Sequence, residues 1–463
     1  MYRNLILNTD SYKTSHYLQY PPNTNFVSSY IESRGGKYEQ LVFFGLQAFI
    51  KEYLAKPITR EDINEAAEIL IAHGVPFYRE GWEYILDQHN GYLPVSIEAV
   101  PEGTVLNTKN VLVQVVNSDP KCFWLTSYLE TALLRAIWYP TTVATVSWHV
   151  KQLIQEFLLK TADNIESLPF KLHDFGARGA SSEESAALGG AAHLINFMGT
   201  DTLSGIIAAR NYYQESIAGF SIPAAEHSTI TSWGQDRETQ AYDNMLQQFA
   251  GEGKIVAVVS DSYNLWEAIA DIWGEQLKER VVNNGGTVVI RPDSGEPVEV
   301  VCRTIEMLMS KFGYTTNSKG YRLLPSYIRV IQGDGVSLAS IRLILEAMTA
   351  KGLSADNIAF GMGAELLQKV NRDTLKFAMK ASAIEIEGTW QDVFKDPITD
   401  PGKTSKKGRL ALVKNQKNAD ETIRLQDING QTNQLRPIFA NGQLLVEDTF
   451  KSIRERSNQK TEL

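Results

Sequence analysis

The chain has 463 residues, 43% of them hydrophobic, which is enough for a sizeable core and for roughly two or three domains of about 150 residues each. Its formal net charge of -9 and pI near 5.5 exclude a general electrostatic attraction to nucleic acid or to an anionic membrane surface. The only cysteines, Cys122 and Cys302, are far apart in sequence and supply neither a disulfide framework nor a thiolate metal site.

The apolar runs are short throughout the chain. The run at 5–7 is too short for a signal peptide, and no stretch of 18 uninterrupted apolar residues occurs. We therefore expect a globular, cytoplasmic protein in a reducing compartment, with no membrane or nucleic-acid partner.

Residues 1–165 mix helical segments with short strands and are expected to form an N-terminal α+β domain. The runs at 93–100 and 111–116 alternate apolar and polar residues around a turn at 101–103. This period of two is typical of a half-buried antiparallel sheet.

Residues 166–382 contain a series of apolar runs that each end in a polar cluster, and most are followed by a segment with helical periodicity. Such a pattern predicts βα units with chemistry at the strand ends, and an irregular TIM-like α/β barrel is the expected closure. An eighth candidate strand lies at 376–382. The preceding clusters lie at 173–179, 198–201, 224–227, 260–261, 291–295, 332–335 and 361–363.

Two segments show the strand-helix alternation best. After the apolar run 255–259, the residues Leu265, Ile269, Ile272, Trp273 and Leu277 recur along one helical stripe. Ser337 precedes another apolar helical pattern and is placed to cap it, because its hydroxyl can accept from a free first-turn amide.

Residues 383–463 begin with a basic loop at 395–409 and end with short apolar runs, which are expected to return to the N-terminal sheet. A solvated loop is the default interpretation of this charge cluster. Lysines on a mobile loop can also close over a polyphosphate.

The barrel rim combines anion-binding and cation-binding groups, and phosphate with magnesium is the simplest ligand pair that fits both. Each residue has an ordinary structural alternative. The glycine turn at 361–363 suits a helix start, and Asp261 and Asp293 suit helix caps. The motif at 291–295 also suits a salt-bridged turn, His227 suits a buried histidine bonded to backbone, and Phe175 suits the core. The rim residues are Arg178, Asp201, His227, Asp261, Arg291, Asp293, Asp334 and Gly361 to Gly363.

Taken together, the motifs resemble those of the nicotinamide phosphoribosyltransferases, which are type II phosphoribosyltransferases. The resemblance runs in order from Asn4 to about Val446. It rests on Thr9 to Lys13, Tyr20 to Thr24, Lys171 to Gly179, Gly199 to Thr202, Pro223 to Ile230, Ile290 to Gly295, Arg329 to Gly335 and Ser405 to Leu410.

The resemblance implies an α/β barrel with an accompanying β-rich domain, working as a homodimer with shared active sites. It implies that nicotinamide and phosphoribosyl pyrophosphate are converted to nicotinamide mononucleotide and pyrophosphate in NAD salvage. Magnesium is the implied cofactor, and ATP is the implied co-substrate.

The same resemblance assigns residues to roles. Phe175 and the partner subunit's Tyr12 are expected to sandwich the pyridine ring, Asp201 to accept from its carboxamide, and His227 to be phosphorylated by ATP. Asp261, Arg291 and Asp293 are expected near ribose, magnesium and pyrophosphate, with Asp261 and Asp293 holding the metal mostly through substrate phosphates and water. The remaining substrate-binding positions are Arg178, Arg34, Gly333, Asp334, Gly363, Arg372, Lys380, Lys395 and Lys403.

Two residues depart from the pattern of these enzymes in the phosphate pocket. Ala364 stands where a second glycine is usual, and Ala378 where a serine hydroxyl is expected, so we expect an altered phosphate grip rather than lost activity. Two alternatives stay open. One is nicotinate phosphoribosyltransferase, which should lack an acid such as Asp201 aimed at the ring substituent, and the other is an inactive binding protein of the same fold.

Overall fold

The computed structural model describes residues 4–400 and 403–459, and its contacts divide the chain into two compact units. The sheet unit contains the described residues up to Thr145, together with Ala208–Glu215 and the residues from Asn371 onward. The barrel unit contains Val146–Ile207 and Ser216–Val370. Among the described residues, no helix has both the length and the apolar character needed to cross a membrane.

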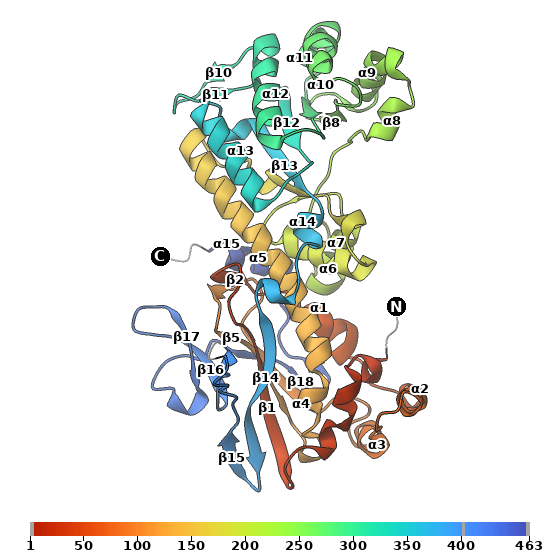
Figure 1. Cartoon of the computed structure of the whole chain (residues 1–463), viewed down its shortest axis with the longest axis vertical. Helices are drawn as coiled ribbons and strands as arrows, with labels where there is room; N and C mark the ends of the chain where they lie inside the picture. Colours follow the sequence, from red (N-terminus) through yellow and green to blue (C-terminus); the bar gives the residue numbers. More distant parts are fainter. Residues whose placement is uncertain (1–3, 401–402, 460–463) are drawn as a thin grey trace. The chain divides into compact units, whose positions relative to one another are not determined.

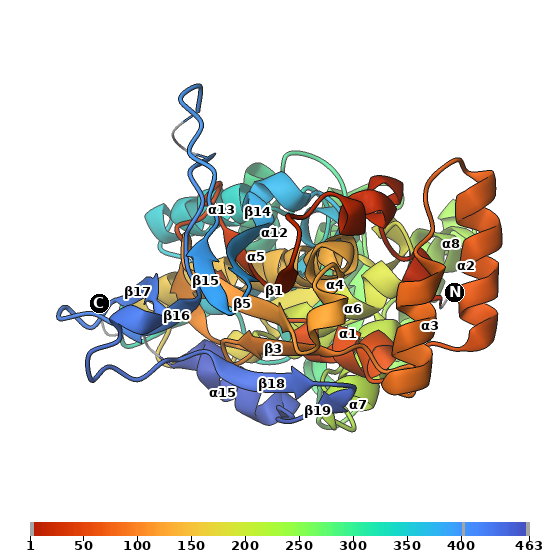
Figure 2. The same cartoon turned by 90° about the horizontal axis from the view of Figure 1, so that it is seen from below.

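The sheet unit is built on a seven-stranded sheet in the order β15-β14-β1-β5-β3-β18-β19, in which all neighbouring pairs are antiparallel (Figure 1). The expected pairing of the runs at 93–100 and 111–116 is confirmed, because β3 pairs antiparallel with β5. Figure 2 shows β18, from the end of the chain, beside β3. The strands are β1 Thr24–Ser33, β3 Val95–Ala99, β5 Val111–Asn117, β14 Phe377–Ile386, β15 Thr389–Asp392, β18 Arg436–Ala440 and β19 Gln443–Leu444.

Smaller elements complete the sheet unit. The strand pairs are β2 Gln40–Val42 with β4 Val105–Asn107, and β16 Leu410–Lys414 with β17 Asp420–Arg424. Its helices are α1 Leu46–Phe49, α2 Arg60–Ala72, α3 Arg79–Gln88, α4 Leu125–Tyr128 and α15 Phe450–Asn458, and the long helix α5 Glu130–Thr161 has residues in both units.

The barrel unit contains a curled six-stranded parallel sheet in the order β7-β6-β13-β12-β9-β8. Single parallel bridges link Phe220 to Gly199 of β7 and Ala224 to Ala257 of β8, so the extended segment between them connects the two edges of the sheet. The expected fold class, an irregular α/β barrel with a β-rich α+β companion, is confirmed. The strands are β6 Leu172–Asp174, β7 Gly199–Thr200, β8 Ile255–Val259, β9 Thr287–Arg291, β12 Ile328–Gln332 and β13 Ile358–Met362.

One expected barrel strand is wrong. Residues 376–382 fall mostly in β14, which pairs with β1 and β15 in the antiparallel sheet. An apolar run indicates that a strand is buried, but it does not indicate which sheet the strand joins.

Helices follow most barrel strands; α12 lies beside β12, and α13 packs against α12 (Figure 1). The cap predicted at Ser337 is confirmed, because its hydroxyl accepts from the Ser340 amide at 3.1 Å at the start of α13. The stripe after β8 is divided among α10, a π-helical segment Ala268–Gln276 and α11, with Trp273 buried. The helices are α6 Glu183–Leu194, α7 Leu203–Tyr213, α8 His227–Thr231, α9 Glu238–Phe249, α10 Leu265–Glu267, α11 Lys278–Asn283, α12 Pro297–Phe312, α13 Leu338–Ala350 and α14 Ala364–Leu367; the hairpin β10 Thr315–Thr316 and β11 Arg322–Leu323 follows α12.

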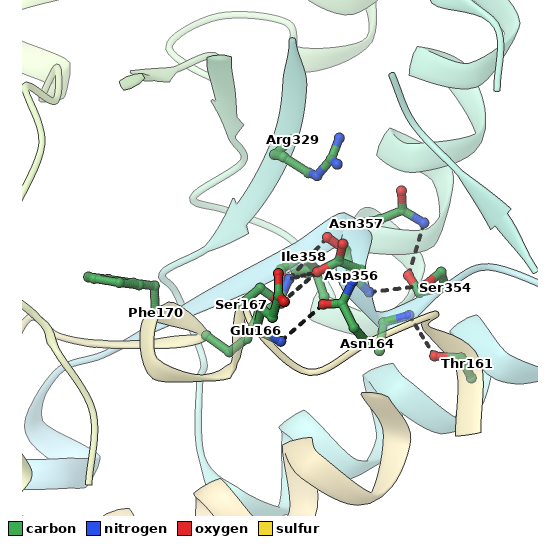
Figure 3. Close-up of polar contacts among 12 residues, drawn as sticks. Thr161, Asn164, Glu166, Ser167, Phe170, Arg329, Ser354, Asp356, Asn357 and Ile358 are labelled. Atoms are coloured by element: carbon green, nitrogen blue, oxygen red, sulfur yellow. Dashed lines mark hydrogen bonds and ion pairs between the residues drawn. The ribbon is translucent and has the colours of Figure 1, made fainter. Parts of the chain in front are cut away.

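A buried ionic cluster lies near the amino ends of the strands. Lys171 Nζ lies 2.9 Å from Asp356 Oδ1 and donates to the carbonyl oxygen of Ile358 at 3.0 Å, while Ser167 donates to the same carboxylate at 2.7 Å (Figure 3). Burial lowers the pKa of Lys171 and of Arg329, whose guanidinium donates to three carbonyl groups at 324–328. The contacts of Lys171 join the starts of β6 and β13.

Candidate active site

The carboxyl ends of β8 and β9 carry a network of charged side chains. His227 Nε2 lies 3.0 Å from Asp261 Oδ1, and Asp261 Oδ2 accepts from the Asp293 amide at 3.1 Å and from the Ser294 hydroxyl. Arg291 Nη2 donates to Asp293 Oδ2 at 3.1 Å. The structure therefore brings together the four residues that the sequence predicted as catalytic.

The capping alternatives for Asp261 and Asp293 and the buried-histidine alternative for His227 are wrong, whereas the salt-bridged turn expected for the 291–295 motif is confirmed by the Arg291–Asp293 pair. Asn264, not Asp261, caps the next helix, where its side chain accepts from the Trp266 and Glu267 amides. Glu296, not Asp293, caps α12. His227 is 45% exposed and bonded to a carboxylate, so it is not a buried histidine held by backbone.

Phe175 follows β6 directly and lies over the centre of the barrel. It packs against the buried cluster of Ala257, Val289 and Ile331, so part of its ring belongs to the core. A Cβ placed on Gly361 would lie 2.0 Å from the Phe175 ring, which shows how closely the ring approaches the β13 backbone. Glycine at 361 thus lets the aromatic ring sit deep in the barrel.

Asp201 follows β7, the neighbour of β6. Its amide donates to the carbonyl oxygen of Asp174 at 2.9 Å, and its exposed side chain accepts from the Ser221 hydroxyl at 2.5 Å. The serine engages one carboxylate oxygen. The other oxygen can accept from a substrate amide.

The predicted phosphate-binding glycines follow β12 and β13. Gly333 lies against Asp293, because a Cβ there would meet Asp293 Oδ1 at 3.2 Å, and Gly363 directly precedes α14. The helix-start interpretation of the glycine turn is therefore confirmed, while phosphate binding there stays a prediction. Asp334 and Arg178 are exposed at the same strand ends.

The sheet unit gathers several predicted phosphate-binding cations. Lys380 lies 3.9 Å from Glu130, which also binds Lys13, and Arg34 donates to Glu32 at 3.2 Å. Burial lowers the pKa of Lys380, and the charges of Arg34, Lys13 and Lys395 lower it further. The charge of Glu130 raises the pKa of Lys380, so the acids and the cations of this cluster partly compensate one another.

Of the other predicted residues of the sheet unit, Tyr12 meets this basic cluster, because Lys13 Nζ lies 5.2 Å from the centroid of its ring. No described contact links Arg372 or Lys403 to the cluster. Tyr12 is 59% exposed and meets His16 edge-on at 5.1 Å. Arg372 pairs with its neighbour Asp373, and Lys403 with Asp400 at 3.0 Å. Their substrate-binding roles stay predictions.

The side chains present fit magnesium only in a limited way. Both oxygens of Asp261 are engaged by hydrogen-bonding partners, and among residues 4–400 and 403–459 no cluster of three or more His, Cys, Asp or Glu side chains could hold a metal. Asp293 Oδ1 faces Gly333. Magnesium commonly uses one or two carboxylates together with substrate phosphates and water, and this arrangement suits that form of binding.

Several residues of the site were missed by sequence reasoning. Ser294 directly follows Asp293, so the motif itself could have indicated it. Ser221 lies in the segment that bridges β7 and β8, which has no strong strand pattern. Gln332 is fully buried and donates to the Asp334 carbonyl oxygen at 2.7 Å, and Asp174 holds the turn after Phe175, but only the folded backbone shows either contact.

Comparison with known proteins gives the same assignment from independent matches. The profile of the nicotinate phosphoribosyltransferase (NAPRTase) family matches residues 170–443, and that of the nicotinamide phosphoribosyltransferase N-terminal domain matches residues 4–97. A nicotinamide phosphoribosyltransferase of Xanthomonas campestris pv. campestris is 55% identical over 98% of both chains. One of Acinetobacter baylyi is 32% identical over 98% of this chain and 97% of its own.

Solved structures support the fold. The nicotinate-nucleotide pyrophosphorylase of Pyrococcus furiosus superimposes with a TM-score of 0.62 at 16% identity, covering 98% of this chain and 95% of its own. Human nicotinic acid phosphoribosyltransferase superimposes with a TM-score of 0.54 at 15% identity, covering 97% of this chain and 92% of its own.

The barrel, its strand-end charges and these matches define the class of the protein, which is a phosphoribosyltransferase. Within that class, the chain belongs to the nicotinate phosphoribosyltransferase (NAPRTase) family, in the branch that contains the nicotinamide phosphoribosyltransferases. The family resemblance predicted from the sequence is confirmed.

We predict that Gly361→Ala displaces the Phe175 ring, because the added methyl group would overlap it. Overpacking of this kind costs about 1–3 kcal/mol, which urea unfolding can measure. Gly179→Ala is the matched control, since its Cβ would meet Ala364 at an ordinary 3.4 Å. Equal stability of the two variants would show that the ring is free to move aside.

Proposed function

We propose that this chain transfers the phosphoribosyl group of phosphoribosyl pyrophosphate to nicotinamide, forming nicotinamide mononucleotide and pyrophosphate in NAD salvage. The main observation in favour of nicotinamide as the substrate is the carboxylate of Asp201. Asp201 follows β7 and Phe175 follows the neighbouring strand β6, so both stand at the carboxyl ends of paired strands. The relative that is 55% identical bears the name of this activity.

The Asp201 carboxylate favours an amide over an acid on the pyridine ring. One oxygen is held by Ser221, and the other can accept from the carboxamide NH2. Nicotinate would instead place a second negative charge nearby. At roughly 4 Å and an effective dielectric near 20, that repulsion is about 4 kcal/mol, or nearly three decades in affinity.

The chemistry needs no general base, because the attacking pyridine nitrogen carries no proton. This nitrogen forms a bond to the anomeric carbon of the ribose as the bond to pyrophosphate breaks, through a transition state with oxocarbenium character. The protein must therefore stabilise the departing negative charge and exclude water.

Cationic groups are available for that task. Arg291 Nε is buried and has no hydrogen-bond partner among the described residues, and the same is true of Arg34 Nη2. Buried donors of this kind suit phosphate oxygens. Magnesium, when bound with the substrate phosphates, would add further charge neutralisation beside Asp293.

His227 is proposed to couple the reaction to ATP. Asp261 holds its Nε2, so the ring presents Nδ1 as the nucleophilic nitrogen, with Asp293 Oδ2 3.9 Å away. The γ-phosphoryl group of ATP would pass to this nitrogen as ADP leaves, and water would later release phosphate.

The proposed assembly is a homodimer in which Tyr12 of each subunit completes the partner's site. The 59% exposure of the Tyr12 side chain supports this role, because an aromatic ring so open to water is free to cover a ligand. Arg178, Asp334, Gly363, Arg372, Lys380, Lys395 and Lys403 complete the proposed substrate site, and a cytoplasmic location suits its soluble substrates.

The purified protein should form nicotinamide mononucleotide from nicotinamide and use nicotinate poorly, in assays of both products with and without ATP. In Asp201→Ser the preference for nicotinamide over nicotinate should fall by about one to two orders of magnitude, out of the roughly three estimated above. Asp236→Ser, at an exposed position away from the strand ends, serves as the control. An unchanged preference in Asp201→Ser would remove Asp201 from substrate selection, and a wild-type preference for nicotinate would favour the nicotinate enzyme.

His227→Ala should retain basal synthesis and lose stimulation by ATP, because the phosphoryl acceptor is absent. The measurements are the rate of product formation with and without ATP and the transfer of labelled γ-phosphate to protein. The control variant His73→Ala removes an exposed histidine of the sheet unit, and it should keep both the stimulation by ATP and the transfer of label to the protein. Stimulation that survives in His227→Ala would rule out the phosphohistidine.

Mixing inactive Tyr12→Ala and Phe175→Ala subunits should restore activity. Random pairing makes half of the dimers mixed, each with one intact site, so about a quarter of the wild-type activity is expected. No recovery, with mixed dimers confirmed by native mass spectrometry, would argue against a shared site.

A further inference from the structure

Asp174, at the carboxyl end of β6, touches both segments that flank the proposed pyridine site. Its side-chain Oδ1 accepts from the Gly176 amide at 2.7 Å, in the turn that presents Phe175. Its main-chain oxygen accepts from the Asp201 amide at 2.9 Å, at the start of the loop that presents Asp201. One residue thus joins the aromatic and the carboxylate side of the site.

The surroundings of this carboxyl group are unusual for a structural aspartate. Asp174 is fully buried, and no described residue donates a hydrogen bond to its Oδ2, although the Thr202 hydroxyl lies close by. Burial, aided by the nearby charge of Asp201, raises the pKa of Asp174 to about 6, even though the Gly176 amide and Thr202 act to lower it. A buried carboxyl group with no cationic partner is costly, so stability alone does not account for it.

The turn held by Asp174 is confined from the other side as well. A Cβ on Gly176 would meet Leu367 at 2.6 Å and Asp174 Oδ1 at 3.0 Å, so the turn has little room to shift. On the Asp201 side, the Thr202 amide donates to the Thr200 hydroxyl at 3.0 Å, which tightens the loop immediately after β7. Loss of the Asp174 acceptor would leave the buried Gly176 amide without its partner in this packed setting, and that unpaired donor would favour a shifted turn.

We propose that Asp174 is a positioning residue that sets the spacing between Phe175 and Asp201, and so determines how well the site holds nicotinamide and excludes nicotinate. This inference rests on the proposed function. It assigns the role to the acceptor oxygen that binds the Gly176 amide. It therefore predicts that a neutral side chain of the same shape can replace the carboxyl group.

The test compares Asp174→Ala, which removes the acceptor, with Asp174→Asn, which keeps it. Asp174→Ala should raise the KM for nicotinamide about 10- to 100-fold, with a smaller change in kcat, since a displacement of about 1 Å in a positioning group has effects of this size. Its preference for nicotinamide over nicotinate should also fall. Asp174→Asn should stay within about threefold of the wild type in all three quantities.

Asp356→Asn is the matched control for lost stability. It alters a carboxylate of the same unit near the opposite, amino ends of the strands, where Asp356 pairs with Lys171 (Figure 3). It should lower the melting temperature and leave the KM for nicotinamide unchanged. If the KM for nicotinamide rises as much in Asp356→Asn as in Asp174→Ala, general destabilisation would explain both changes, and the proposal would be overturned.

Hydrogen exchange of the wild-type protein provides a second measurement if Asp174→Ala does not fold. Nicotinamide should slow exchange of the Gly176 and Asp201 amides together, because both donate to Asp174, and slowing of only one would contradict the proposal. If the wild type turns over nicotinamide and a folded Asp174→Ala variant keeps the same KM, kcat and substrate preference, this inference alone would be overturned. Absence of nicotinamide turnover in the wild type would overturn the proposed function and this inference with it.

Discussion

Parallel pairing of β6 with β7 on one side and β13 on the other is the constraint on which the candidate site depends. Because parallel strands end at the same edge of a sheet, the residues that follow them are brought to one face. Phe175, Asp201 and Gly363 are far apart in the chain, yet each stands directly after one of these three strands. The bridging segment at 220–224 adds Ser221 to the same region.

Close packing at this face limits which residues the positions accept. The ring of Phe175 lies so near the β13 backbone that a side chain at 361 would overlap it, and Gly333 lies between that ring and Asp293. The aromatic side chain is therefore both the top of the barrel core and the floor of the proposed site. A residue with two such roles cannot vary without disturbing folding and binding together.

Each of the two units holds its charged side chains in specific pairs. In the barrel unit, Asp201, Asp261 and Asp293 each have a specific hydrogen-bonding partner. In the sheet unit, Arg34 pairs with Glu32, and Lys13 and Lys380 lie near Glu130. A chain with a net charge of -9 repels phosphates at long range, so capture must come from such local clusters. Burial is the main cause of the lowered pKa of Lys380, and the neighbouring cations add to it, so a bound phosphate would favour the charged form of this side chain.

The sequence by itself determined the strand-end clusters, among them the residues of the charged network at β8 and β9, and the cap at Ser337, because hydrophobic periodicity and local capping are short-range properties. Tertiary structure alone decided that 376–382 joins β1 in the antiparallel sheet, that Asn264 rather than Asp261 caps the helix after β8, and that Asp174 holds the turn after Phe175. Each of these outcomes is a choice of partner. An apolar run or a carboxylate in the sequence indicates that the segment needs a packing or hydrogen-bonding partner. Which residue becomes that partner depends on which backbone segments pack side by side in the folded chain.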